Sequence, residues 1–204
     1  MKQVVIINGK ANVGKDTFVN LCKKHIGTIN YSSVRIIKFI AEAFFDYSED
    51  IKSDKDRKFL ADFKELVDTY CDFTTKEIMK KYNDFLNSNM ELLFIHIREP
   101  ENIEKIKNLI PNCKTLCITS NRDDIPEIKN SHADKDVMNY NYDYYISNNQ
   151  DKGYLEVQAI HFIRKLKDIN KNSNNGISIT VSDTPPNNRY VPEAKELPPK
   201  TYII

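Results

Sequence analysis

The sequence has almost no excess of charge of either sign, because 30 lysine and arginine residues stand against 29 aspartate and glutamate residues. A net charge of +1 produces no overall field that would favour nucleic acid or an anionic membrane. The chain also lacks an apolar stretch of 18 residues, and the N-terminal MKQVVIING is too short to be a signal peptide. We therefore expect a soluble, cytoplasmic protein without nucleic-acid or membrane partners, which must bind any anion at a local site.

Cysteine pairs are also missing, since none of the four cysteines forms a CxxC motif. The cysteines lie in apolar segments, which is typical of core thiols in a reducing cytosol. The four histidines are too scattered to indicate a zinc site. At 204 residues, the chain is long enough for one domain with a sizeable core but short for two.

Glycine is scarce as well, yet two of the five glycines lie in one motif, GKANVGKDT. The motif fits the GxxxxGK phosphate loop, with Asp16 where Ser or Thr is usual. Such glycines let backbone amides point at phosphate oxygens, the following helix adds its positive end, and Lys15 reaches the outer phosphates. An ordinary glycine turn is the alternative. The predicted nucleotide-binding residues are Gly9, Lys10, Ala11, Asn12, Val13, Gly14, Lys15, Asp16 and Thr17.

Apolar runs alternate with segments of helical period along most of the chain. This pattern predicts an α/β fold, in which helices cover a parallel five-stranded sheet. We expect a short helix after the second strand, through Phe44 and Tyr47, and an amphipathic helix over 153–168. The expected strands are 3–8, 31–39, 90–97, 114–119 and 143–147.

Three segments interrupt that alternation. Residues 54–89 read as two consecutive helices, the second opening at Thr74, which has the spacing of a capping box with Glu77. Residues 120–141 are polar with little periodicity, and a connection of this length is usually functional. Residues 171–204 form a tail in which ISITV (177–181) could add an edge strand here or on a neighbouring molecule, giving a homodimer.

Arg98 follows the third strand at a position suited to phosphate. Residues 94, 96 and 98 project to one side of that strand, and ligands of parallel sheets bind at the carboxyl ends of the strands. The guanidinium group of Arg98 can bind two phosphate oxygens at once. A surface arginine at a strand end is the alternative.

The GKDT ending and the segment IHIREPENIEKI resemble the phage and bacterial deoxynucleoside monophosphate kinases and their relatives in the nucleoside-monophosphate-kinase branch of P-loop proteins. The resemblance covers about residues 1–168 and implies a P-loop NTPase three-layer fold over 1–170, with ATP and Mg²⁺ as cofactors. It makes 54–89 the helical NMP-binding insertion and 120–141 the lid, which would bring Arg122 to the transferring phosphoryl group.

The same resemblance assigns roles to individual residues. Lys15, Arg98 and Arg122 would be catalytic, with a solvated loop charge as the alternative for Arg122. In the phosphate loop itself, Asp16 replaces the hydroxyl that normally ligates magnesium and could instead hold a magnesium-bound water. Lys38, in the segment IIKFIAEAF (36–44), matches the substrate lysine of the family. The acceptor phosphate would then be bound by Lys38, Arg57 and Arg98.

His96 departs from the family pattern, which has an acidic residue at this position. A missing acid harms transfer to a hydroxyl more than transfer to an already anionic phosphate, so His96 favours a monophosphate acceptor. A satisfied buried histidine is the alternative. Two other functions stay open: a dephospho-CoA-kinase-like metabolite kinase, which needs a base, and a non-catalytic ATP-binding regulator, which Asp16 and His96 favour.

Overall fold

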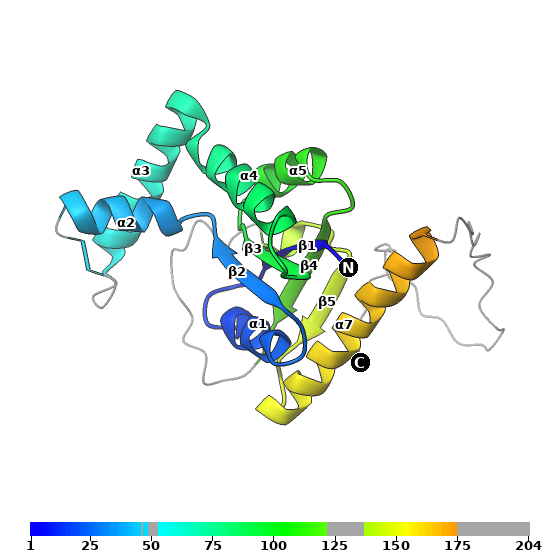
Figure 1. Ribbon diagram of the computed structural model, residues 1–204. Coiled ribbons are helices and arrows are strands. Elements are labelled where there is room, and N and C mark those ends of the chain that lie inside the picture. The colour runs from blue at the N-terminus through cyan, green and yellow to red at the C-terminus, as the bar shows by residue number, and fades with distance from the viewer. Residues whose placement is uncertain (46, 49–52, 122–136, 175–204) are drawn as a thin grey trace, which may run out of the picture.

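A five-stranded sheet forms the centre of the computed structural model, which describes residues 1–45, 47–48, 53–121 and 137–174 (Figure 1). All strand pairs are parallel, and the strand order is β2-β3-β1-β4-β5. The predicted parallel five-stranded sheet is therefore confirmed. The strands are β1 (Gln3–Asn8), β2 (Thr28–Ser32), β3 (Leu92–His96), β4 (Lys114–Thr119) and β5 (Tyr144–Ser147).

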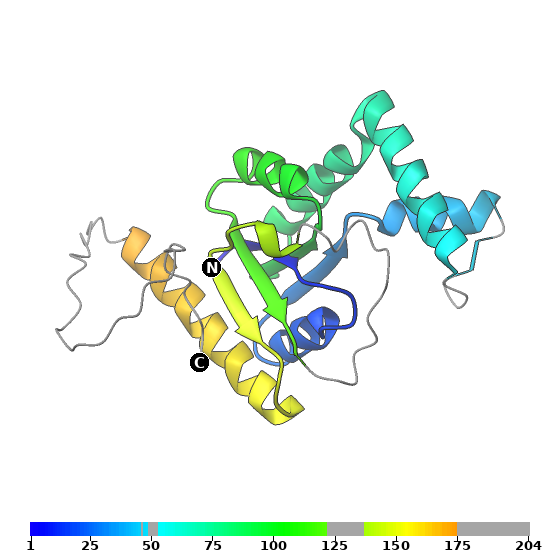
Figure 2. The same ribbon diagram turned by 180° about the vertical axis from the view of Figure 1, so that it is seen from behind.

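Helices cover both faces of this sheet, with α1 and α7 on one side and α4 and α5 on the other (Figures 1 and 2). The helices α2 and α3 lie beyond the β2 edge of the sheet (Figure 1). The bounds are α1 (Lys15–Lys23), α2 (Arg35–Phe44), α3 (Asp54–Cys71), α4 (Phe73–Leu86), α5 (Pro100–Leu109), the short 3-10 helix η1 (Val137–Asn139) and α7 (Lys152–Asn174).

The core has two halves because successive strand residues point to opposite faces. Val5 and Ile7 of β1 pack toward α1 and α7, whereas Val4 and Ile6 pack toward α4 and α5. The ring of Phe94 lies in the first half, 6.3 Å from the ring of Phe18 between centroids. This alternation also directs His96, two residues further along β3, toward the α1 side of the sheet.

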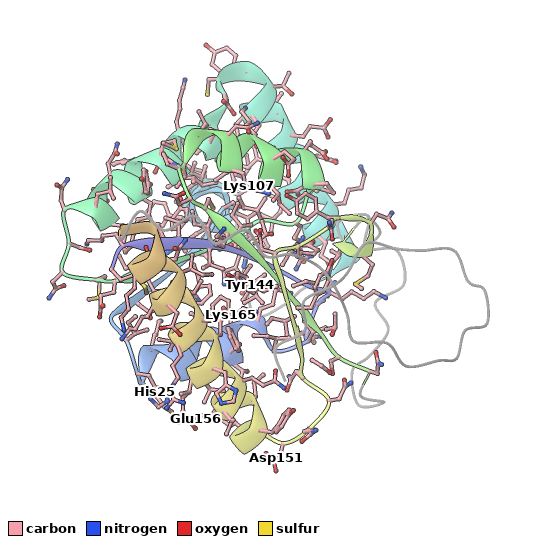
Figure 3. All side chains as sticks on the ribbon, turned by 90° about the vertical axis from the view of Figure 1, so that its right-hand side faces the viewer. His25, Lys107, Tyr144, Asp151, Glu156 and Lys165 are labelled. Carbon is pink, nitrogen blue, oxygen red and sulfur yellow. The ribbon has the colours of Figure 1, made fainter. Side chains whose placement is uncertain are left out.

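Side-chain contacts also hold α7 on the face of the sheet that α1 covers. The ammonium of Lys165 lies 5.4 Å from the centroid of the Tyr144 ring, and His25 and Glu156 approach to 3.2 Å (Figure 3).

None of the helices in the described part of the chain is long and apolar enough to cross a membrane.

The order of the strands creates a topological switch point between β1 and β3. The chain leaves β1 toward β2 and leaves β3 in the opposite direction, toward β4. Connections that diverge in this way leave a crevice at the carboxyl ends of the two adjacent strands, where ligands of open α/β sheets bind. In this protein, the segments that follow Asn8 and His96 border this position.

The predicted strand over 31–39 is wrong, because β2 ends at Ser32 and α2 begins at Arg35. The apolar residues of RIIKFIAEAF are compatible with either structure over a short stretch. Burial distinguishes the two, since the buried residues Ile37 and Ala41 are four positions apart, as on one face of a helix. Lys38 therefore lies within a helix and not at the end of a strand.

The two-helix segment over 54–89 is confirmed as α3 and α4, but its capping differs from the prediction. The capping box is at the start of α3, where Ser53 and Asp56 bond each other's backbone amides. At the start of α4, the carboxylate of Asp68 accepts hydrogen bonds from the amide and hydroxyl of Thr74, both at 2.8 Å. The predicted capping box of Thr74 with Glu77 is thus replaced by an acid from the preceding helix.

The final helix is longer than predicted, since α7 continues to Asn174 and takes in the start of the expected tail. Most of the expected lid, with Arg122, lies outside the described residues, as does the ISITV segment of the tail.

Candidate functional site

The loop between β1 and α1 contains the predicted phosphate-binding motif. Gly9 and Gly14 have φ angles of 144° and 96°, which residues with a side chain rarely adopt. A Cβ atom on Gly9 would lie 2.4 Å from the carbonyl oxygen of Ile118, and one on Gly14 would lie 2.5 Å from Nδ2 of Asn148. Both glycines are therefore required by the backbone conformation and by close neighbours from β4 and the end of β5.

The loop leads directly into α1, whose N-cap is Gly14 and whose N-terminus has no side-chain cap. The first amides of a helix have no partner within the helix, and the helix dipole makes this end positive. The ammonium of Lys15 bonds the carbonyl oxygens of Gly9 and Lys10, both at 2.6 Å. A positive charge is thus held over the loop, next to the positive end of α1.

A second group of side chains, from the middle of β2 and the end of β3, meets α1. The ring of His96 bonds Oδ1 of Asn30 at 2.7 Å, and Nδ2 of Asn30 donates to Oδ1 of Asp16 at 3.0 Å. Because Asn30 gives its N–H to the carboxylate, its oxygen must accept, so Nε2 of His96 carries the hydrogen. These two hydrogen bonds connect His96, Asn30 and Asp16, and so link β3, β2 and the first turn of α1.

His96 is neutral at physiological pH. Burial lowers its pKa to about 4, an effect that the carboxylate of Asp16 opposes and that the positive charges of Lys15 and Arg98 reinforce. The 3.7 Å approach of His96 to Asp16 is consequently not an ion pair near pH 7. The two cations that lower this pKa follow neighbouring strands, Lys15 after β1 and Arg98 after β3.

The pKa of His96 has a consequence for stability. The unfolded chain binds a proton near pH 6.5, whereas the folded protein resists protonation until about pH 4, so stability falls as the pH drops between these values. Between pH 7 and pH 5 we expect a loss of about 2 kcal/mol in the free energy of unfolding from this group. This loss is measured by urea unfolding at pH 7 and at pH 5, with the wild type and His96→Gln compared in the presence of EDTA.

Glutamine at position 96 retains an N–H donor for Asn30 but does not titrate, so the other ionisable groups cancel in the comparison. The difference in unfolding free energy between the two proteins should shrink or reverse as the pH falls. An unchanged difference from pH 7 to pH 5 would show that His96 is not held neutral by burial.

The predicted site residues fall into three groups. Lys15, Asp16 and Arg98 are brought together at the carboxyl ends of the central strands. Arg57 is exposed in the first turn of α3 and Lys38 is half-buried in α2, so their assignment to an acceptor phosphate stays a prediction. Arg122 lies outside the described residues.

A magnesium site at Asp16 is compatible with the geometry. Among the residues that the structure describes, no group of three or more His, Cys, Asp or Glu side chains could hold a metal ion. Mg²⁺ bound with a nucleotide does not need such a group, because one or two carboxylates act together with phosphate oxygens and water. Asp16 fits that requirement, since its side chain is 77% exposed in the first turn of α1.

Three asparagines of the site were not identified from the sequence. Asn8 follows four apolar residues at the end of β1, Asn30 bridges His96 and Asp16, and Nδ2 of Asn148 donates to the carbonyl of Val13 at 2.9 Å. A local signal exists only for Asn8, a polar residue at the end of an apolar run and directly before Gly9. The other two contact residues distant along the chain, which no local pattern reveals.

A scan against protein-family models found no match for this chain, and no curated protein matches its sequence.

Proposed function

We propose that this protein is an ATP-dependent phosphotransferase, which moves the γ-phosphate of ATP to a small phosphorylated acceptor of the nucleoside or deoxynucleoside monophosphate class. The observations that support it are a loop whose two glycines admit no side chain, the Lys15 ammonium bonded to two carbonyls of that loop, and the hydrogen bond by which Asn8, directly before the loop, contacts the backbone of Arg98. Two cations on two adjacent strand ends are suited to two phosphate groups that must react with each other.

Each residue would act through position and charge. The amides of the 9–14 loop and the N-terminus of α1 would hold the triphosphate, and the ammonium of Lys15 would move from the carbonyls of Gly9 and Lys10 to its outer oxygens. The guanidinium of Arg98 would bind the acceptor or the group in transfer. When bound, Mg²⁺ would neutralise charge on the phosphates, with Asp16 holding it through water.

The state of His96 favours a phosphate over a hydroxyl as the acceptor. A hydroxyl must lose a proton during transfer, which requires a base with a pKa near the working pH. His96 is a poor base because its pKa is about 4 and its Nε2 hydrogen is bonded to Asn30. An acceptor phosphate is already anionic and needs no such base. This argues against the dephospho-CoA-kinase-like alternative.

The test is ADP release from ATP and Mg²⁺ with a panel of nucleoside and deoxynucleoside monophosphates, each paired with its own nucleoside. We expect release with one or a few monophosphates and none with the matching nucleosides, and ³¹P NMR should identify the product as a diphosphate. Release with the nucleosides alone would overturn the proposed acceptor class.

A regulator that holds ATP without turnover is the second candidate, because Asp16 replaces the hydroxyl that usually ligates magnesium in this kind of loop. Tight ATP binding without release in the presence of any acceptor would support it over the phosphotransferase.

A further inference from the structure

Asn8, the last residue of β1, connects the glycine loop with the backbone at Arg98. Its side chain is buried, with the residue only 1% exposed. Oδ1 accepts a hydrogen bond from the amide of Gly9 at 2.8 Å, and Nδ2 donates to the carbonyl of Arg98 at 3.0 Å and to the hydroxyl of Tyr142 at 2.7 Å. One side chain thus contacts the start of the loop and the segment that follows β3.

The orientation of this amide is determined by its backbone partners. The Gly9 N–H can only donate, so the atom facing it must be oxygen, and the Arg98 carbonyl can only accept, so the atom facing it must be nitrogen. Both Nδ2 hydrogens are then used, one for Arg98 and one for Tyr142. An aspartate here would place an unprotonated oxygen against the Arg98 carbonyl.

Tyr142 extends the network to a third segment. Its hydroxyl accepts from Asn8 and donates to the carbonyl of Val137 at 2.9 Å. Its ring packs edge-on against Tyr140 and Tyr145, with centroid distances of 4.8 and 5.7 Å. Because burial raises the pKa of Tyr142, the hydroxyl keeps its proton and can donate at any physiological pH.

We propose that Asn8 and Tyr142 are a positioning pair, which fixes the start of the glycine loop and the backbone of Arg98 relative to each other. The proposal rests on the proposed function for its catalytic consequence, since the loop and Arg98 are assigned to the two reacting phosphates. Neither residue is a catalytic residue, because Asn8 and Tyr142 are 1% and 5% exposed and their polar atoms bond protein groups. Their role is to hold the distance that an in-line transfer needs.

Two variants and one control test the pair. Tyr142→Phe removes the hydroxyl with little change in shape, and Asn8→Asp replaces the donor that faces Arg98. The matched control is Tyr144→Phe, because Tyr144 is 4% exposed but lies on the other face of β5, where its ring packs edge-on against Phe162 with a centroid distance of 5.3 Å. All three are compared with the wild-type full chain.

The first readout needs no substrate. In the ligand-free protein we expect the Gly9 amide to exchange its hydrogen about tenfold faster in Tyr142→Phe, which corresponds to one weakened hydrogen bond. Amide exchange at 97–99 should accelerate in the same variant. Tyr144→Phe should change neither, once the exchange of the core strands is used to correct for global stability.

The second readout is kinetic, with the acceptor found in the panel. We expect kcat to fall about tenfold in Tyr142→Phe and about a hundredfold in Asn8→Asp, with KM for ATP changing less than threefold, because misplacement affects the transfer step more than binding. Equal effects in Tyr142→Phe and Tyr144→Phe, or unchanged exchange at Gly9, would overturn the pair. A third outcome separates the two proposals. If Gly9 exchanges faster in Tyr142→Phe but neither this variant nor the wild type transfers phosphate, the network is supported and the proposed function is refuted.

Discussion

Replacement of Lys15 by methionine is expected to lower phosphoryl transfer about a thousandfold while the protein stays folded. Methionine keeps the apolar stem and removes the ammonium, and losing one preorganised positive donor at a developing charge costs about 100- to 1000-fold in rate. The side chain is half-buried at the start of α1, and the carbonyls it bonds belong to the loop itself. The measurement is acceptor-dependent ADP release, with ATP affinity from a binding titration.

The matched control is Lys23→Met, which removes the same charge from the exposed last turn of the same helix. We expect its activity to stay within about twofold of wild type, because a solvated surface charge contributes little. Circular dichroism should show both variants folded. Lys15→Met activity within tenfold of wild type would exclude a role for this ammonium in the transfer.

Gly9→Ala should destabilise the protein by on the order of 4 kcal/mol in the free energy of unfolding. The φ angle of 144° is strained for alanine, which costs about 1–3 kcal/mol, and the added Cβ would lie 2.4 Å from the carbonyl oxygen of Ile118. That oxygen belongs to the backbone of β4 and cannot rotate away, so overpacking adds a further cost of about 1–3 kcal/mol. Urea unfolding followed by circular dichroism measures the change.

Gly27→Ala provides the control for this substitution. A Cβ atom on Gly27 would meet Sδ of Met90 at 3.3 Å, near the end of a flexible side chain that can move. We expect an effect smaller than about 1 kcal/mol in either direction. If the two alanine variants were equally stable, the close packing of the loop against β4 would not be a constraint.

The local parts of the fold were predictable because their signals are contiguous in the sequence. The strand over 114–119 has the bounds that its apolar run indicates, and α5 begins at Pro100, a residue favoured at the first helical position. The exposed Phe39 lengthens the apolar run of the segment 31–39, although Ile37 and Ala41 are the buried residues of α2. Only burial distinguishes a short strand from a helix in such a run.

The electrostatic state of the site was not predictable in the same way. The sequence places His96 after a buried strand, but its pKa depends on burial and on three charged groups, Asp16, Lys15 and Arg98, from two different strand ends. Sequence reasoning left open whether His96 is a functional group or a satisfied histidine. The bond to Asn30, 66 positions away, accounts for its tautomer and its orientation.

By itself, the sequence determined the alternation of strands and helices, the glycine loop before α1 and the cations that follow β1 and β3, because each of these follows from neighbouring residues. The tertiary structure alone decided which side chains meet. The bond between Asn8 and Tyr142 joins residues 134 positions apart, and the bond between Asn30 and His96 joins residues 66 positions apart. Such contacts form when packing brings distant segments together and excludes the water that would otherwise satisfy their polar groups.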